Sequence, residues 1–386
     1  MNGRVVSAKD ALGNVTTFAY DSMGRLIKTV DAKGTATEYT YTKTGLLQET
    51  KDALSGVYSY EYDALGRLIR ETNENGEKTS YTYNALGRVL SVTNPLGYTD
   101  SFAYDANGRI LSVTDRNNAV TKYKYDNNGN ITETTDAMDN TSYFEYDKLN
   151  RLIKTTLNGM DGPDEQVTLY EYDGRGLVTK VINALGDEKL NVYDQNGNLI
   201  STTDEDGLVT QYAYDTRNLA QSISYTGGKK AEFVYNKAGE LVELTDWTGK
   251  TSFTLDLLGR ITAVNDSNNK NVTYGYDTVG NQTSIGYLDA SAVTYGYDAL
   301  NRLATVKDAD GKTSSYQYNP AGHPLEQSYT NGITEKYTYD EAGQLLETTD
   351  GLGSLLYEYE YDPMGNVIYE YKKGENESFP LSSSYI

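Results

Sequence analysis

The sequence predicts an all-β protein in which tandem β-hairpins of about 21 residues form one continuous antiparallel sheet. Three observations predict this fold class. A phrase of Tyr-Asp, two variable residues and Gly recurs along the chain, and a second Asp/Asn-x-x-Gly turn signal follows about ten residues later. The six or seven residues between turns are rich in Tyr, Thr, Val, Leu and Ile, which is an ordinary strand length and composition. No segment has helical periodicity, so the fixed period defines the architecture.

The repeat occurs in 17 copies. One copy, residues 60–72, reads as a strand, a four-residue turn and a second strand. The position before the turn is Tyr20, Tyr41, Tyr62, Tyr83, Tyr104, Tyr125, Tyr146, Tyr172, Tyr193, Tyr214, Tyr235, Leu255, Tyr276, Tyr297, Tyr318, Tyr339 and Tyr361 in successive copies. We therefore expect a repeat array over 1–371 and an irregular C-terminal tail over 372–386. The longer step near 157–165 indicates an insertion, either a lengthened turn or a partner-binding loop.

The turn residues have a geometric reason to recur. Asp or Asn at the first turn position accepts a hydrogen bond from the backbone two residues on, and Gly at the fourth position adopts the left-handed conformation that closes the hairpin. Asn150, Asn218 and Asn301 replace this Gly in three copies, and Asn tolerates positive φ better than most residues. The predicted structural turn residues are Asp21, Gly24, Asp63, Gly66, Asp105, Gly108, Asp298, Asp340 and Gly343.

The strand before each first turn alternates, with aromatic residues on one face and Glu, Thr or Lys on the other. This pattern predicts a structural aromatic ladder along one face of the sheet, formed by Tyr20, Tyr62, Tyr83, Tyr104, Tyr125 and Tyr146. Hydrophobic residues make up only 38% of the chain, but 37 of the residues are Tyr. Because Tyr combines an apolar face with a hydroxyl that can meet water, we expect wet surface on both sheet faces.

A meander of this length cannot remain flat. Two strands from each copy give a ribbon on the order of 160 Å wide, and open twisted sheets rarely exceed about ten strands without curling or splitting. A rolled ribbon of this width must be hollow, because side chains fill a barrel only up to about eight strands. Tight hairpins argue against a parallel β-helix, whereas a straight solenoid and stacked sandwiches remain open alternatives.

Composition excludes several function classes. The formal net charge of −21 disfavours nucleic acid and anionic membrane surfaces as partners. The chain has no cysteine, no apolar run long enough for membrane insertion and no signal-peptide core at its start. Its first residues align with the second half of a hairpin, so we expect the chain to be a piece of a longer polypeptide.

No catalytic, cofactor-binding or metal site is predicted. The single histidine, His323, occupies a turn-flanking position that is Arg or Asn in other copies, and one His without Cys cannot supply a zinc site. The repeated Asp residues are explained by turn geometry. Trp247 is interpreted as a packed hairpin aromatic or, alternatively, as a platform for a sugar ring. The arginines that follow the first turns are expected to form a ladder that pairs with neighbouring carboxylates.

The Tyr-Asp-x-x-Gly-Arg-Leu phrase at this period resembles the YD or RHS repeat over roughly residues 2–371. That family includes bacterial Rhs proteins, Tc-toxin B and C components, wall-associated proteins and teneurins. The resemblance implies a β-hairpin ribbon that spirals into a hollow shell, and in toxin members the shell encloses a toxic domain. The Asp-Pro-rich core segment and the toxin that end those arrays do not follow here, so cleavage and cargo are not carried over to any residue.

The sequence therefore predicts a non-catalytic shell or scaffold, part of a larger secreted or surface protein of bacterial type. Its expected partner is another segment of the parent protein, enclosed as cargo, and the expected localisation follows from the resemblance alone. The alternative is a cell-surface adhesin that binds glycan or protein through exposed aromatics. The two terminal strands would leave free sheet edges, so edge-to-edge self-association is also expected.

Overall fold

The computed structural model describes residues 3–158, 165–268, 270–374 and 379–380. These residues form 36 β-strands and, within those ranges, no helix. The first twelve strands are β1 (Ser7–Lys9), β2 (Val15–Tyr20), β3 (Leu26–Val30), β4 (Ala36–Tyr41), β5 (Leu47–Lys51), β6 (Val57–Tyr62), β7 (Leu68–Thr72), β8 (Lys78–Tyr83), β9 (Val89–Thr93), β10 (Thr99–Tyr104), β11 (Ile110–Thr114) and β12 (Val120–Tyr125).

The next twelve are β13 (Ile131–Thr135), β14 (Thr141–Tyr146), β15 (Leu152–Leu157), β16 (Gln166–Tyr172), β17 (Val178–Ile182), β18 (Glu188–Tyr193), β19 (Leu199–Thr203), β20 (Val209–Tyr214), β21 (Ala220–Tyr225), β22 (Lys230–Tyr235), β23 (Leu241–Asp246) and β24 (Gly249–Leu255). The last are β25 (Ile261–Asn265), β26 (Asn271–Tyr276), β27 (Gln282–Gly286), β28 (Ala292–Tyr297), β29 (Leu303–Lys307), β30 (Thr313–Tyr318), β31 (Pro324–Ser328), β32 (Thr334–Tyr339), β33 (Leu345–Asp350), β34 (Leu355–Tyr361), β35 (Val367–Lys372) and β36 (Phe379–Pro380).

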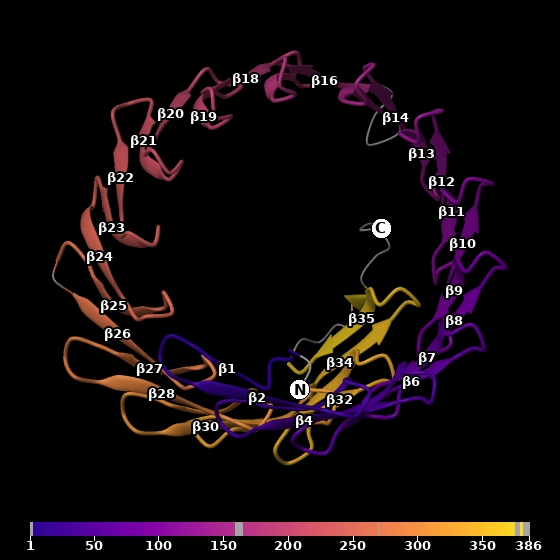
Figure 1. Cartoon of the computed structure of the whole chain (residues 1–386), viewed down its shortest axis with the longest axis vertical. Coiled ribbons are helices and arrows are strands. Elements are labelled where there is room, and N and C mark those ends of the chain that lie inside the picture. Colours follow the sequence, from indigo (N-terminus) through magenta and orange to yellow (C-terminus); the bar gives the residue numbers. More distant parts are fainter. Residues whose placement is uncertain (1–2, 159–164, 269, 375–378, 381–386) are drawn as a thin grey trace.

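Each strand pairs with the next along the chain, and every pairing is antiparallel, from β1–β2 to β35–β36. The sheet therefore follows the order of the sequence as one long meander. It curls into a ring-like spiral in which the first strands return beside the last ones (Figure 1). The predicted all-β spiral of hairpins is confirmed, and the straight solenoid and the stacked sandwiches are excluded.

The ribbon is a single layer without a packed interior. Among the described residues, only Ala231, Asn94, Thr156 and Thr348 are buried, and no large side chain is fully buried. The chain exposes 23598 Å², whereas a compact monomer of this mass exposes about 15,000 Å². Both faces of the wall are therefore accessible to solvent, and the middle of the ring is not filled by a core (Figure 1).

A β-bulge occurs in the hairpin that contains the first turn of every repeat. These bulges account for the regular curvature of the ribbon. In the hairpin of β6 and β7, Glu61 pairs with Arg70 but the next residue, Tyr62, pairs with Leu68, so Ile69 is the extra residue. The same register shift occurs in the corresponding hairpins along the array, for example between Ala19 and Tyr20. A bulge bends its strand and increases the local twist, so identical bulges at equal spacing curve the ribbon evenly.

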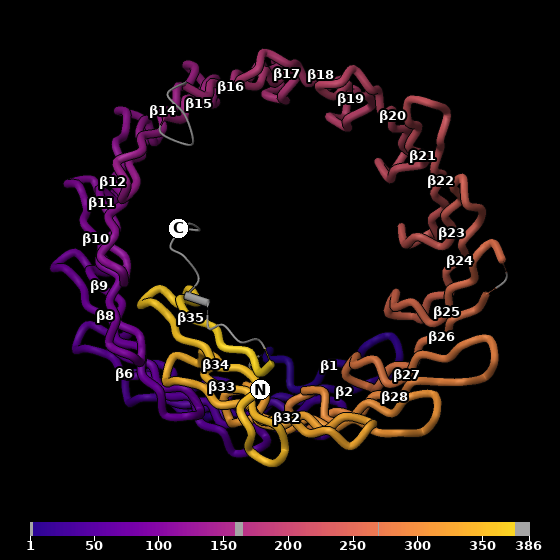
Figure 2. The backbone as a smooth tube through the Cα atoms, turned by 180° about the vertical axis from the view of Figure 1, so that it is seen from behind, coloured from indigo at the N-terminus to yellow at the C-terminus, as the bar shows by residue number. Residues whose placement is uncertain are grey.

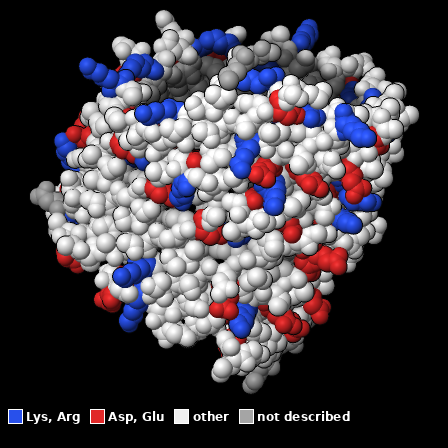
Figure 3. Space-filling view, turned by 60° about the horizontal axis from the view of Figure 1, so that its bottom comes forward, with Lys and Arg blue, Asp and Glu red and all other residues white. Residues whose placement is uncertain are grey.

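The two ribbon faces differ in their side chains. Cross-strand ion pairs join Lys28 to Glu38 at 2.9 Å and Arg70 to Glu61 at 3.0 Å on the face opposite the tyrosines. Figure 3 shows charged side chains of both signs spread over one side of the molecule, with uncharged residues covering most of it. Exposed pairs of this kind contribute little to stability individually.

Candidate functional site

The first turn of each repeat has its hydrogen bonds satisfied locally. In the copy between β6 and β7, Gly66 N donates to Asp63 O at 3.0 Å, and Asp63 N donates to Arg67 O at 2.9 Å. Asp63 Oδ1 also accepts hydrogen bonds from Leu65 N and Arg67 N. The backbone and side-chain hydrogen bonds from Arg67 lower the pKa of Asp63 below its ordinary value. One carboxylate thus closes the loop by accepting backbone donors that would otherwise point at solvent.

The fourth turn position is left-handed in all 17 first turns. It has positive φ at Gly24, Gly66, Gly108 and Gly343, among others, and at Asn150, Asn218 and Asn301. Asp21, Asp105, Asp298 and Asp340 hold the same place in their own turns as Asp63, with the fourth residue donating to their carbonyl oxygens. These turns lie along one edge of the ribbon, which we call rim A. The second turns of the repeats lie along the opposite edge, which we call rim B.

The arginine after the turn joins one repeat to the next. Arg67 Nε and Nη2 both lie 2.6 Å from Asp63 Oδ2, and Arg67 Nη1 donates to Asn84 O of the next turn at 3.1 Å. Its guanidinium also stacks over the ring of Tyr83, 4.9 Å from the centroid. A charge-assisted pair and a cation–π contact therefore meet at one side chain. The expected arginine ladder therefore links neighbouring repeats, and we call these linking contacts the relay.

The tyrosine before the turn completes this relay. The Tyr83 hydroxyl donates to Leu68 O of the preceding repeat at 2.6 Å. The equivalent bond is made by Tyr20 to Val5 O, Tyr104 to Val89 O and Tyr125 to Ile110 O. Tyr62 and Tyr146 end β6 and β14 at the same position. Sequence reasoning placed the tyrosines on the wall but missed these bonds, because they join residues 15 positions apart.

A second solution appears where Asn replaces Arg. Asn130 Nδ2 donates to Asp126 Oδ2 at 2.8 Å and to Asn150 Oδ1 at 2.9 Å, which bridges two turns. The same pair recurs as Asn198–Asn218 and Asn281–Asn301. All three left-handed Asn residues of rim A are thus partners of an Asn one repeat earlier. The signal was present in the sequence as a coupled substitution 20 residues apart.

Arginine also reaches the next repeat from inside the turn. In two copies a leucine follows the turn, and the third turn position is Arg175 or Arg217 instead. Arg175 Nε donates to Asp173 Oδ2, and its Nη1 donates to Asp194 O. Arg217 makes the corresponding bonds to Asp215 and to Asn236 O. The contact between turns is therefore retained although the residue that makes it has moved.

The spiral is held closed by contacts between turns far apart in the sequence. Lys33 Nζ, on rim B, lies 2.7 Å from Asp277 Oδ2 and 3.0 Å from Asn301 Oδ1, both on rim A one revolution later. Burial opposes ionisation of Asp277, but hydrogen bonds from Lys33 and Asn281 outweigh it and lower its pKa to about 2. We call this line of contacts the seam.

Two further bonds continue the seam. Ala321 N donates to Asn75 Oδ1 at 3.2 Å, and Asn117 Nδ2 donates to Asp362 Oδ2 at 2.9 Å. These partners are 246 and 245 residues apart, so one revolution takes nearly the same length of chain at both places. Figure 2 shows the N-terminal strands lying beside the C-terminal ones where the ribbon overlaps itself.

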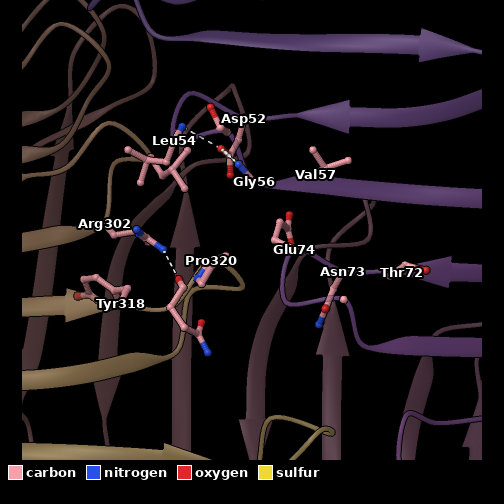
Figure 4. A pocket seen from close by; sticks show the side chains of 14 residues that line it. Asp52, Leu54, Gly56, Val57, Thr72, Asn73, Glu74, Arg302, Tyr318 and Pro320 are labelled. Carbon is pink, nitrogen blue, oxygen red and sulfur yellow. Dashed lines mark hydrogen bonds between the residues drawn. The ribbon is translucent and has the colours of Figure 1, made fainter.

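The seam encloses a cavity of about 530 Å³ between the two revolutions. Asp52, Leu54 and Glu74 approach from rim B, while Arg302 and Pro320 approach from rim A (Figure 4). The guanidinium of Arg302 is engaged within its own revolution, because its Nε donates to Asp298 Oδ2 at 2.7 Å and its Nη1 donates to Asn319 O at 3.0 Å. Leu300 also lines this space, so an apolar turn tip from each revolution faces the cavity.

Two tyrosine clusters surround a carboxylate on the wall. The Tyr81 hydroxyl donates to Glu71 Oε1 at 2.6 Å, and partial burial together with Glu71 raises the pKa of Tyr81 to about 12. Tyr329 and Tyr337 both donate to Glu335 Oε2, at 2.8 and 2.9 Å. Burial and Glu335 raise the pKa of both phenols. These phenols remain protonated at neutral pH and act as hydrogen-bond donors.

His323 and Trp247 each contact a neighbouring aromatic ring. The His323 ring stacks on Tyr339 with centroids 5.0 Å apart, in the place that Arg takes in other copies. Trp247 is 55% exposed, packs edge-on to Tyr225 at 6.1 Å and lies under Lys229 Nζ at 4.9 Å. Neither residue is brought beside a nucleophile or a cluster of ligands by these contacts.

Within the described ranges, no group of three or more His, Cys, Asp or Glu side chains could hold a metal ion. No helix there is long and apolar enough to cross a membrane. Of the insertion near 157–165, residues 159–164 lie outside the described residues, as do 375–378 and 381–386 of the expected tail.

Comparison with known structures shows the same fold. The crystal structure of TcdB2-TccC3-TEV matches with a TM-score of 0.57 and 16% identity, covering 95% of this chain and 26% of that one. The crystal structure of TcdB2-TccC3 matches with a TM-score of 0.56 and 16% identity over 96% and 27%. A Photorhabdus luminescens Tc holotoxin pore matches with a TM-score of 0.55 and 15% identity over 94% and 25%. The chain spans about a quarter of these structures.

Family models cover nearly the whole repeat array. A search of curated protein sequences found no match. The RHS repeat model matches residues 1–36, 41–77, 318–355 and 339–374. The Teneurin YD-shell model matches residues 78–218, 141–284 and 170–329, which together exceed half of the chain. The hairpin spiral and the contacts between neighbouring repeats agree with these matches. The chain therefore belongs to the Teneurin YD-shell family of repeat proteins.

Proposed function

We propose that this chain forms part of the wall of a hollow shell and that the shell encloses another polypeptide segment of the same parent protein. The observation that carries this proposal is the single-layered wall, which exposes 23598 Å² and surrounds a space without a packed core. The role is structural and non-catalytic. The wall is the repeat array over 1–371, and the longer protein to which it belongs is secreted or surface-exposed and of bacterial type.

The mechanism is steric. Neighbouring strands use each other's backbone groups from β1 to β36, so the wall presents few free backbone donors to an enclosed chain. Both faces carry hydroxyl and charged side chains, such as Lys28 and Glu38, which remain hydrated. The turn residues and the tyrosine relay serve this role by fixing the shape of the wall.

The similar structures support this role. Two of them are the crystal structures of TcdB2-TccC3-TEV and of TcdB2-TccC3-Cdc42. At 16% identity the likeness carries the fold, so the enclosed partner is our inference from wall geometry. The seam joins one revolution of the ribbon to the next, and such a joined wall is compatible with an enclosed segment of the parent protein.

Protection of a tethered segment tests the proposal. β35 lies inside the outline of the ring when the molecule is viewed along this axis (Figures 1 and 2), and the proposed enclosure predicts that a chain continuing from it enters the ring. An unstructured reporter peptide is attached after Ile386, and its cleavage by a protease is followed over time. We expect cleavage several-fold slower than for the same reporter added as a separate chain. Equal rates for the tethered and separate reporters would contradict enclosure.

A further inference from the structure

The seam shows which surface rim A contacts where another revolution of the ribbon lies against it. Within the seam, rim A of the second revolution contacts rim B of the first through Lys33, Asn75 and Asn117. Only the first turns from Asp277 onward take part in these contacts. The earlier first turns, from Asp21 to Gly259, present the same kind of edge with no seam partner in the part of the chain that the structure describes.

Two turns that share Asp-Ala-Leu at their first three positions show the difference. Asp63-Ala64-Leu65-Gly66 lies before the seam and Asp298-Ala299-Leu300-Asn301 lies within it, and both carry Leu at the third position. Leu65 is 77% exposed, whereas Leu300 is half-buried against the first revolution. The third-position tips Met23, Leu86 and Leu149 are likewise 71% to 73% exposed. A row of apolar tips along free rim A therefore lacks the cover that the seam gives to Leu300.

Free rim B also carries exposed apolar tips, interspersed with polar ones such as Asp206 and Asp310. Its second-turn tips include Met138 at 74%, Leu185 at 87% and Leu352 at 97% exposure. In the seam, the rim B tip Leu54 and the rim A tip Leu300 line one cavity. The exposed apolar tips on both free rims thus resemble the Leu54–Leu300 part of the seam, whereas the other seam contacts are an ion pair and hydrogen bonds.

We propose that rim A of one copy of this chain docks onto rim B of a second copy and continues the seam between molecules. The contact joins two different surfaces, so it is head-to-tail and leaves one rim free at each end for further copies. Each copy carries a net charge of −21, so repulsion opposes the contact and its attractive part is apolar. Association is therefore expected to strengthen as salt rises and the charges are screened.

Complementary variants test the direction of the contact. The double variant Leu65→Gln/Leu86→Gln impairs rim A and leaves rim B intact, while Leu185→Gln/Leu352→Gln does the reverse. Size-exclusion chromatography with light scattering on the unaltered chain should show a monomer–oligomer equilibrium that shifts to oligomers with concentration and with salt. Each double variant alone should remain monomeric or nearly so. An equimolar mixture of the two should form a dimer and no longer species.

Matched controls keep the result interpretable. Val192→Gln/Val234→Gln alters two exposed side chains on the sheet face, at 52% and 48% exposure, and should associate as the unaltered chain does. Circular dichroism confirms that all variants keep their strands. A chain that stays monomeric at every concentration and salt overturns the proposal. Oligomers that persist in both rim variants also overturn it, because they would arise from the terminal strand edges at β1 and β36.

Discussion

At the scale of single residues, the recurring Asp and Arg of the first turn each make contacts of two kinds. Asp63 closes its own turn through Oδ1 and holds Arg67 through Oδ2. Arg67 then reaches Asn84 O and the Tyr83 ring of the following copy. Asp63, which the sequence assigns to the turn, is therefore also part of the link between repeats.

The left-handed turn position gives a clean test of backbone strain. Gly87 has φ of +81°, and a Cβ added there would meet no atom within 4 Å. Gly87→Val should destabilise the hairpin by about 1–2 kcal/mol because β-branched residues resist positive φ. Gly87→Asn should cost clearly less, as Asn occupies this position in three other turns. Thermal unfolding compares the two, and equal melting temperatures would contradict the strain argument.

The tyrosine hydroxyl can be removed without changing the ring. Tyr83→Phe deletes the 2.6 Å bond to Leu68 O and keeps the ring under Arg67. We expect a loss of about 1 kcal/mol of stability, the usual net value of a hydrogen bond. Tyr39→Phe is the control, since the Tyr39 hydroxyl makes no hydrogen bond within the described residues. A melting temperature that falls equally in both variants would show that the bond to Leu68 contributes nothing.

At the scale of the hairpin, neighbouring copies are coupled in two alternative ways. Eight of the 17 pairs place an Arg against a following Gly, while three pairs place Asn against Asn. At Gly108 an added Cβ would lie 2.3 Å from Arg88 Nη2, so a side chain there conflicts with the arginine. The positive φ of Gly108, +93°, also favours Gly at that position.

This coupling predicts non-additive substitutions. Asn150→Gly removes the acceptor of Asn130 Nδ2, and Asn130→Arg introduces a guanidinium beside the Asn150 side chain. Each single change should cost about 0.5–1.5 kcal/mol, the range for one hydrogen bond. The double variant recreates the Arg–Gly pair and should recover most of that loss. A double-mutant cycle from urea unfolding measures the coupling, and strictly additive costs would contradict it.

At the scale of the whole molecule, stability depends on many turn carboxylates acting together. Hydrogen bonds hold the pKa of turn residues such as Asp63 and Asp126 below the ordinary value of 3.8 in the folded chain. At the seam, the pKa of Asp277 is about 2. The unfolded chain therefore binds more protons in this range, and folding stability falls as pH decreases.

The resulting pH profile has a defined window. The contribution of these carboxylates is complete above the unfolded pKa of 3.8 and is lost as pH falls through their lower folded values, to about 2 at Asp277. We expect a melting temperature that is nearly constant from pH 7 to about 5 and then decreases steadily toward pH 2. Differential scanning calorimetry across this range measures it. A melting temperature unchanged at pH 2 would show that the depressed pKa values do not support folding.

The sequence by itself determined the local structure. Asp or Asn at the first turn position, Gly or Asn at the fourth and alternating tyrosines specify hairpins whose hydrogen bonds lie within a few residues. Those interactions are short-range, so period and residue type suffice to predict the hairpins, the continuous sheet and the need for a hollow form. Two adjacent apolar residues follow many of the first turns, as in Leu68-Ile69, and they mark the bulge in those hairpins.

Only the tertiary structure decided how the repeats join and where the ribbon meets itself. The Tyr83–Leu68 and Asn130–Asn150 bonds span neighbouring copies, and the Lys33–Asp277 contact spans a whole revolution. The bonds between neighbouring copies depend on how adjacent hairpins pack, whereas the partner of Lys33 depends on the twist accumulated over many bulged hairpins, a small angle per repeat that no residue type encodes alone. The seam, the two free rims and the docking that we infer from them therefore follow from geometry summed along the ribbon.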